Sequence, residues 1–156
     1  MSANAMDRLW RDYQDHHQTT GNRTCHMVGI PLIIIGLLGL LAIPIAHLGR
    51  WPIEVSLLIV TLVGAIDIWL DPRLGLLMLV TAFVIYLAAR LVAWQVLSAL
   101  FVIGWGFQFV GHGVYERRSP AFYKNLAHLI VGPLWALNHF THLRNEAGDA
   151  TASEGS

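Results

Sequence analysis

The chain has 156 residues, of which 55% are hydrophobic and only 13% are charged, and its mean hydropathy is +0.54. Soluble domains have about 45–50% apolar and about 25% charged residues, so this composition excludes an ordinary water-facing domain and indicates a membrane protein. Ten Lys and Arg balance ten Asp and Glu, and the sequence has no basic stripe or Gly-rich phosphate loop, which excludes the usual electrostatic pattern of a nucleic-acid-binding protein.

Residues 1–25 are polar and carry three Asp and three Arg. A cleavable signal peptide instead begins with a positive region and a short apolar core. We therefore expect the first apolar segment to be retained.

Helical spacing places Tyr13 and His17 on one face, at positions i and i+4. Gly21-Asn22 is expected to end this first helix.

Four later segments are apolar enough to cross a bilayer, whose hydrocarbon core takes roughly 20 residues of helix. They are residues 27–48, 53–70, 74–89 and 91–111. The second contains Asp67 and ends at Asp71-Pro72, because proline disfavours helix at the residue before it. Arg90 separates the third from the fourth, since one helix of about 38 residues would be nearly twice as long as a bilayer is thick.

The apolar run at residues 126–137 is shorter and contains Gly132-Pro133, which favours an interfacial or re-entrant helix over a full crossing. Residues 145–156 are small and polar and are expected to be disordered. The sequence therefore predicts an all-α membrane domain over residues 1–144. We expect it to contain four transmembrane helices plus N-terminal and C-terminal interfacial or re-entrant helices.

With four crossings, eight of the ten Lys and Arg residues fall on one side, which the positive-inside rule assigns to the cytoplasm. Both termini are then cytoplasmic. The same topology gathers seven of the eight histidines at the cytoplasmic end: His16, His17, His26, His112, His128, His139 and His142. Only His47 lies at the other end.

The end of the fourth span combines three polar groups. Gln108, His112 and Glu116 are each four residues apart, which predicts one helix face with an amide, an imidazole and a carboxylate.

A single cysteine excludes an internal disulfide and a thiolate zinc site, so a metal would have nitrogen and oxygen ligands. A set of several histidines with one carboxylate is typical of non-haem Fe(II) enzymes that activate dioxygen. Haem is the alternative, but axial histidines should face each other rather than gather at one rim.

Two non-enzymatic interpretations stay open. A transporter or channel would carry polar residues deep within several spans, because these residues line the path, whereas here only Asp67 and a few hydroxyl or amide residues do so. A non-catalytic scaffold would need no clustered imidazoles. Taken singly, His17 and His26 could be interfacial side chains that bind lipid headgroups, and metal analysis would separate these interpretations from the enzyme.

Three blocks of sequence resemble the 2-hydroxy fatty acid dioxygenases of fatty acid α-oxidation. In chain order they are His17-x4-Asn22-x3-His26-x2-Gly29-x-Pro31, Gln108-Phe109-x-Gly111-His112-x3-Glu116-x3-Pro120-Ala121 and Gly132-Pro133. The resemblance covers about residues 7–140. It implies a small multi-span membrane enzyme of lipid metabolism that requires Fe(II) and uses dioxygen to shorten a 2-hydroxy fatty acid by one carbon.

By position, the resemblance implies that His17, His26 and His112 are essential and bind the iron, and Glu116 matches an acidic position of the second block. His16 duplicates the first histidine, and His128 stands where many relatives have glutamine. Both are therefore further candidate ligands. Zinc in place of iron, or a different lipid substrate, is an alternative that the resemblance leaves open.

The remaining candidates concern the substrate. Three residues are expected to orient the metal ligands or the substrate by hydrogen bonds: Tyr13, Asn22 and Gln108. Three others can meet the substrate carboxylate, because the guanidinium fork matches a carboxylate bidentately: Arg23, Arg117 and Arg118. The acyl tail is expected among the aliphatic spans. The bacterial relatives of this family indicate a bacterial inner membrane as the location.

Overall fold

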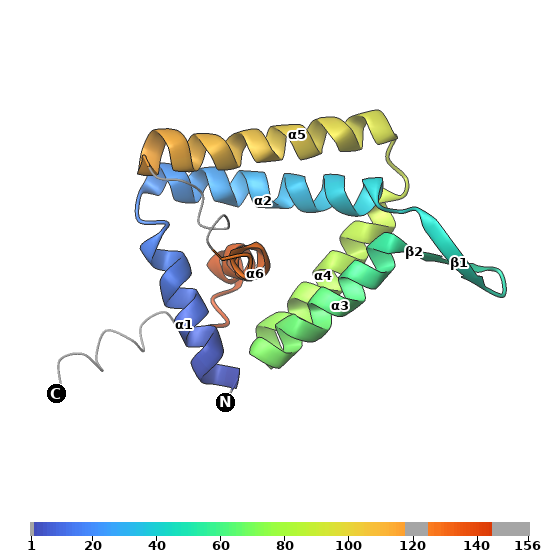
Figure 1. The fold of residues 1–156 in the computed structure, drawn as a ribbon, viewed down its shortest axis with the longest axis horizontal. Coiled ribbons are helices and arrows are strands. Elements are labelled where there is room, and N and C mark those ends of the chain that lie inside the picture. The colour runs from blue at the N-terminus through green and yellow to red at the C-terminus, as the bar shows by residue number, and fades with distance from the viewer. Residues whose placement is uncertain (1, 118–124, 145–156) are drawn as a thin grey trace.

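The computed structural model describes residues 2–117 and 125–144 of the chain, and most of these are helical (Figure 1). The elements are α1 (Ser2–Asp15), α2 (Thr20–Leu40), β1 (Pro44–Leu48), β2 (Trp51–Glu54), α3 (Val55–Leu70), α4 (Pro72–Ala89), α5 (Trp94–Val110), η1 (Gly111–Glu116) and α6 (His128–Thr141). The strands β1 and β2 form an antiparallel hairpin. The segment η1 is a π-helical turn that continues α5.

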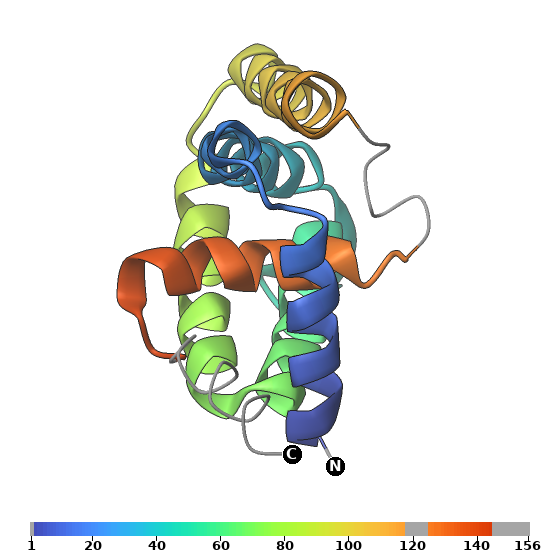
Figure 2. The ribbon, with the colours of Figure 1, turned by 90° about the vertical axis from the view of Figure 1, so that its left-hand side faces the viewer.

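The helices α2 and α5 lie side by side and run in opposite directions (Figures 1 and 2). Glycines permit this close packing. A Cβ atom at Gly104 would lie 2.9 Å from the carbonyl oxygen of Gly29, and one at Gly36 would lie 2.7 Å from the carbonyl oxygen of Leu97. Because the two helices are antiparallel, the start of α2 lies beside the end of α5, and this brings distant parts of the sequence together.

We expect Gly104→Ala to destabilise the protein by about 1–3 kcal/mol, because the new methyl group would press on backbone atoms of α2. Gly106→Ala is the matched control on the same helix, since a Cβ there meets no described atom within 4 Å. That control should be neutral or stabilising by up to about 1 kcal/mol, because alanine favours helix over glycine. Thermal unfolding in detergent measures both, and equal melting temperatures would contradict this packing.

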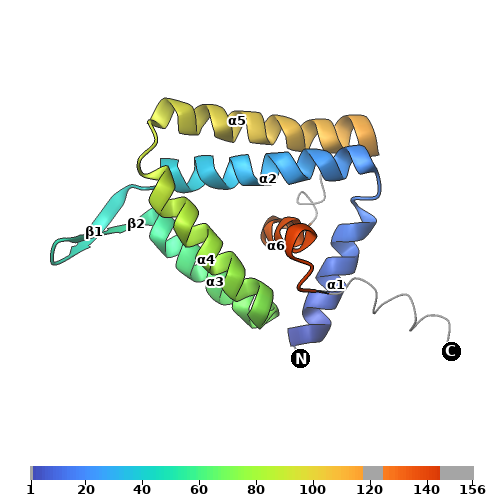
Figure 3. The ribbon, with the colours of Figure 1, turned by 180° about the vertical axis from the view of Figure 1, so that it is seen from behind.

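The helices α3 and α4 form a second pair, which runs away from α2 and α5 at a steep angle (Figure 3). Asp71 makes the turn between them by accepting hydrogen bonds from the backbone N–H groups of Arg73 and Leu74. The helix α6 crosses the space between the two pairs, and α1 packs against it (Figure 2). The main hydrophobic core lies where α1, α4 and α6 meet, and its buried members are Met6, Trp10, Tyr13, Leu70, Leu74, Met78, Val131, Leu134 and Trp135.

The β-hairpin end is held by a buried carboxylate. Glu54 is 3% exposed and accepts hydrogen bonds from the Arg90 guanidinium and the Tyr86 hydroxyl, both at 2.9 Å. This contact ties the end of β2 to the end of α4. It lies near the end of α2 and the start of α5, far from the start of α2 (Figure 1).

The structure corrects three expectations about the spans. The first apolar helix covers Thr20–Leu40 instead of 27–48, and residues 44–54 form the hairpin, so the fold is not entirely helical. Pro44, and Gly49 with φ of +62°, favour a turn over a continued helix. The break after α1 falls at residues 16–19 rather than at Gly21-Asn22, because the Thr19 side chain caps α2 by accepting from the backbone N–H of Asn22.

Within the described residues, three helices rather than four are long and apolar enough to cross a membrane: Thr20–Leu40, Pro72–Ala89 and Trp94–Glu116. The helix α3 is apolar but has 16 residues, so it is about 24 Å long against a hydrocarbon core of about 30 Å. The helix α6, expected at 126–137, covers His128–Thr141 and is also too short. The tail at 145–156 lies outside the described residues.

Candidate metal centre

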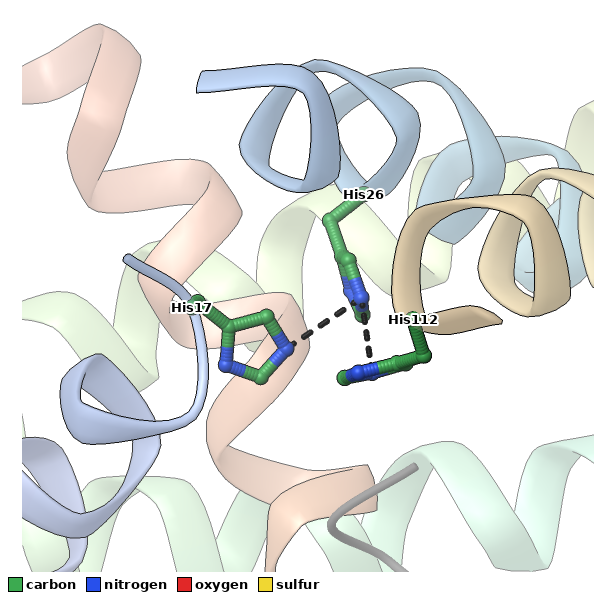
Figure 4. Close-up of side chains that lie close together, drawn as sticks. All are labelled: His17, His26 and His112. Atoms are coloured by element: carbon green, nitrogen blue, oxygen red, sulfur yellow. Dashed lines mark hydrogen bonds between the residues drawn. The ribbon is translucent and has the colours of Figure 1, made fainter. Parts of the chain in front are cut away.

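Three histidines from separate elements meet at the start of α2. His17 follows α1, His26 lies in the second turn of α2, and His112 lies in η1. The antiparallel packing of α2 and α5 brings His26 beside His112, although 86 residues separate them in the sequence. All three are buried, with exposed fractions of 1%, 5% and 3%. Figure 4 shows the three rings turned toward one another.

The nitrogen atoms of these rings converge on one point. The His26 Nε2 atom lies 3.2 Å from the Nε2 of His17 and 3.1 Å from the Nε2 of His112. One ligand atom from each residue lies within 4.8 Å of the other two. Imidazole nitrogens bind zinc at about 2.0–2.1 Å, so two of them on one ion are about 2.9–3.4 Å apart at angles of about 90–110°. The spacing around His26 therefore fits a shared metal ion.

Tyr13 determines which nitrogen atoms face the centre. Its backbone carbonyl oxygen can only accept a hydrogen bond, so the Nδ1–H of His17 donates to it at 2.6 Å. Its hydroxyl lies 3.2 Å from the Nδ1 of His26. The carbonyl leaves the lone pair of His17 on Nε2. Where the Tyr13 hydroxyl accepts from the Nδ1–H of His26, the lone pair of His26 also lies on Nε2, which is the form that binds metals. The buried Tyr13 ring also stacks on His17 with centroids 3.9 Å apart.

The electrostatics of His17 suit a metal ligand. Burial lowers the pKa of His17 from 6.5 to about 4, although the hydrogen bond to the Tyr13 carbonyl acts in the opposite direction. The imidazole is therefore neutral at neutral pH. A neutral ring has the lone pair that a metal requires, and imidazole suits Zn, Cu, Fe and Ni. The three residues fit a metal ion of this group, and the donor set by itself does not choose among them.

His16 and His128 form a separate group around Asp12. The Nε2–H of His128 donates to the Asp12 carboxylate at 2.7 Å, and the Nδ1–H of His16 donates to the Asp12 backbone carbonyl at 2.8 Å. The hydrogen bond from His128 holds the pKa of Asp12 below its usual range, so this carboxylate is ionised. The buried Nδ1 of His128 has no hydrogen-bond partner among the described residues. The structure thus places both histidines beside the three-histidine group but outside it.

Glu116 does not reach the centre in this structure. Its carboxylate accepts hydrogen bonds from the backbone N–H of Thr19 at 2.8 Å and from the Thr19 hydroxyl at 3.1 Å. In an α-helix, Glu116 would share a face with His112. In the structure this segment is the π-helical turn η1, and the Glu116 carboxylate holds the loop before α2.

The other expected site residues are spread around the centre. Gln108 is buried beside it, and its Nε2 has no partner in the part of the chain that the structure describes. Asn22 is buried and donates to the His16 carbonyl, while Arg23 donates to the His17 carbonyl at 2.8 Å. Arg117 is exposed in a left-handed conformation at the end of η1. Arg118 lies outside the described residues.

An apolar cavity of about 260 Å³ leads away from the histidines between α2, α5 and α6. Its walls follow one face of each long helix. On α2 these are His26, Ile30, Ile33, Ile34 and Leu37, and on α5 and η1 they are Phe101, Trp105, Gln108 and His112. The imidazoles occupy one end of both rows. From His26 to Leu37 the helix rises roughly 16 Å. The cavity therefore combines a polar end with a long apolar wall.

Comparison with known proteins gives the family. The family model of 2-hydroxy-palmitic acid dioxygenase Mpo1-like proteins matches residues 3–143. The chain belongs to the Mpo1-like family. It is also similar to the 2-hydroxy-palmitic acid dioxygenase MPO1 of Saccharomyces cerevisiae, with 52% identity over 42 residues. This alignment covers 26% of the chain and 24% of the yeast protein. No solved structure matches.

Membership of the Mpo1-like family confirms the resemblance found in the sequence. Sequence reasoning missed one residue of the site, Asp12, which binds His128 across 116 positions. A signal was present, because Asp12 and His16 stand at positions i and i+4 of a helix and point to the same side. The partner His128 could not have been found this way, since the contact depends on how α6 crosses α1.

Proposed function

We propose that this Mpo1-like protein is an Fe(II)-dependent membrane dioxygenase that shortens 2-hydroxy fatty acids by one carbon. The observation that carries the proposal is the convergence of three buried imidazole nitrogens at one end of an apolar cavity. His17, His26 and His112 would hold the ion. A bacterial inner membrane with both termini in the cytoplasm is part of the proposal; it applies the positive-inside rule to four crossings, so it requires the 16-residue α3 to cross together with α4.

A bound Fe(II) supplies open coordination positions for dioxygen chemistry. The overall reaction balances without an added reductant: one 2-hydroxy acid and one dioxygen give the shorter acid, carbon dioxide and water. The chain's own residues bind and orient the substrate. The acyl tail lies along the apolar rows of α2 and α5. The Nε2 of Gln108, which has no hydrogen-bond partner among the described residues, donates to the substrate carboxylate.

In the proposed reaction, His128 accepts the proton of the substrate hydroxyl. The ionised Asp12 carboxylate accepts from Nε2–H, so in the neutral ring the lone pair lies on Nδ1. That atom is buried without a partner among the described residues, and His128 lines the same cavity as the three histidines. An imidazole oriented by a carboxylate in this way is the usual arrangement of a general base.

Replacing Asp12 with Asn should lower kcat on a 2-hydroxy acid by about a hundredfold, the lower range for loss of general base catalysis, and leave bound iron unchanged. Asp15→Asn is the matched control, because Asp15 lies on the same helix and is exposed. Steady-state oxygen uptake and metal analysis measure the two effects. An unchanged kcat would exclude the proton transfer, and loss of iron would place His128 or Asp12 in the metal site instead.

The proposed function itself is tested with the purified, iron-loaded protein, 2-hydroxypalmitate and oxygen. We expect oxygen uptake together with formation of pentadecanoate, which mass spectrometry detects. Palmitate is the matched control, because it has the same chain length and lacks the hydroxyl group. Iron-loaded protein that forms no shortened acid from 2-hydroxypalmitate would contradict the proposal.

A further inference from the structure

A second apolar cavity of about 140 Å³ lies between α2, α3, α4 and α6. We propose that it is the distal part of the lipid site and takes the end of long acyl chains. The proposal rests on the proposed function, because it extends the cavity assigned there to the acyl tail. Four residues line both cavities, and these form the wall between them: Ile34, Leu37, Leu129 and Pro133.

The position of the wall follows from α2. Ile33 lines the first cavity, Leu38 lines the second, and Ile34 and Leu37 line both. The wall therefore stands at the end of the apolar row that starts at His26. An acyl chain that follows this row meets side chains of Ile34, Leu37 and Leu129 rather than helix backbone. Rotation of these side chains can connect the two spaces without separating the helices.

The lining of the second cavity suits a hydrocarbon. Along α3 it runs from Ile59 to Asp67, a rise of about 12 Å, and every lining residue before Asp67 is apolar or glycine. Asp67 is 1% exposed, and its buried Oδ1 has no partner among the described residues. An apolar chain gains nothing by contact with a buried polar group that lacks a hydrogen bond. Asp67 therefore marks the depth limit of the second cavity.

The test measures affinity against chain length. Ala82 lines the second cavity and not the first, so Ala82→Leu reduces the space for the distal end alone. Val80→Leu is the matched control, because Val80 lies on the same helix and is 53% exposed. Leu37→Ala is the opposite change, since it removes part of the wall. Affinities come from displacement of a fluorescent fatty acid by 2-hydroxylaurate, 2-hydroxypalmitate and 2-hydroxylignocerate, which requires no turnover.

We expect Ala82→Leu to weaken binding of 2-hydroxylignocerate about tenfold, the loss of about two buried methylene groups, and to change binding of 2-hydroxylaurate less than about twofold. Leu37→Ala should favour the longest acid relative to the shortest. Equal effects on all chain lengths in both variants would overturn the inference. Failure of all three acids to displace the fluorescent probe from the wild-type protein would also overturn it. Oxidation of 2-hydroxypalmitate without length-dependent effects would refute the second cavity alone. Length-dependent binding without oxidation would refute the proposed reaction and support the cavity.

Discussion

His26→Ala is expected to reduce the iron bound by the purified protein to background and to abolish oxygen-dependent turnover. The Nε2 of His26 is the middle atom of the group, 3.2 Å from that of His17 and 3.1 Å from that of His112. Removing it leaves two imidazoles, whose nitrogens lie within 4.8 Å of each other, and no third ligand between them. Metal analysis of protein purified in detergent measures the effect.

The matched control for His26→Ala is His47→Ala, because His47 is exposed in the β-hairpin at the other end of α2. This control should retain iron and activity. His112→Ala should behave like His26→Ala, and the melting temperature shows that each variant is folded. Full iron content in a folded His26→Ala protein would remove His26 from the ligand set and contradict the three-histidine centre.

Tyr13→Phe is expected to lower iron affinity about ten- to a hundredfold, which is the usual effect of removing a hydrogen bond that orients a metal-binding histidine. The substitution deletes the hydroxyl beside the Nδ1 of His26. It keeps the backbone carbonyl that binds His17 and the ring that stacks on it. The iron spectrum should therefore change while the fold is kept.

Tyr86→Phe is the matched control for Tyr13→Phe, since it removes a buried hydroxyl that donates to Glu54 away from the histidines. It should lower the melting temperature and leave the iron affinity unchanged. Equal iron affinities in Tyr13→Phe and the wild type would show that the hydroxyl does not orient His26. Tyr13 acts through its neighbours in this account, so a change in affinity without a change in fold is the decisive result.

Much of the centre could be predicted from the sequence because the chemistry is local to two blocks. His17 and His26 are near in sequence, and His112 lies at the end of a later apolar helix. The predicted order of spans places all three at the same end of the bundle. Ionisable residues at membrane depth face the protein interior, so the three are expected to turn inward. The antiparallel packing of α2 and α5 then explains why they meet.

The parts that could not be predicted depend on backbone geometry and on contacts between distant helices. Hydrophobic periodicity does not reveal the π-helical turn of η1, nor that the Glu116 carboxylate is bound by Thr19, 97 residues away. The β-hairpin at residues 44–54 is apolar enough to resemble the end of a membrane span. The contact between Asp12 and His128 exists only because α6 crosses between the two helix pairs.

The location of the histidines beside an aliphatic wall has a physical explanation under the proposed function. A 2-hydroxy acid has a polar head that carries the reacting carbon and an apolar tail. The three imidazoles stand at one end of the first cavity, and the apolar rows of α2 and α5 extend from them. The arrangement can hold the reacting carbon at the metal and bury the tail within the protein.

X-ray absorption spectroscopy of the iron-loaded wild-type protein tests the central claim most directly, because it reports the ligand atoms of the bound ion. We predict three imidazole nitrogens bound to the iron, at a distance slightly longer than the about 2.0–2.1 Å of histidine on zinc because Fe(II) is the larger ion, together with the outer scattering of the imidazole rings. A shell of oxygen atoms alone would contradict a centre built by His17, His26 and His112.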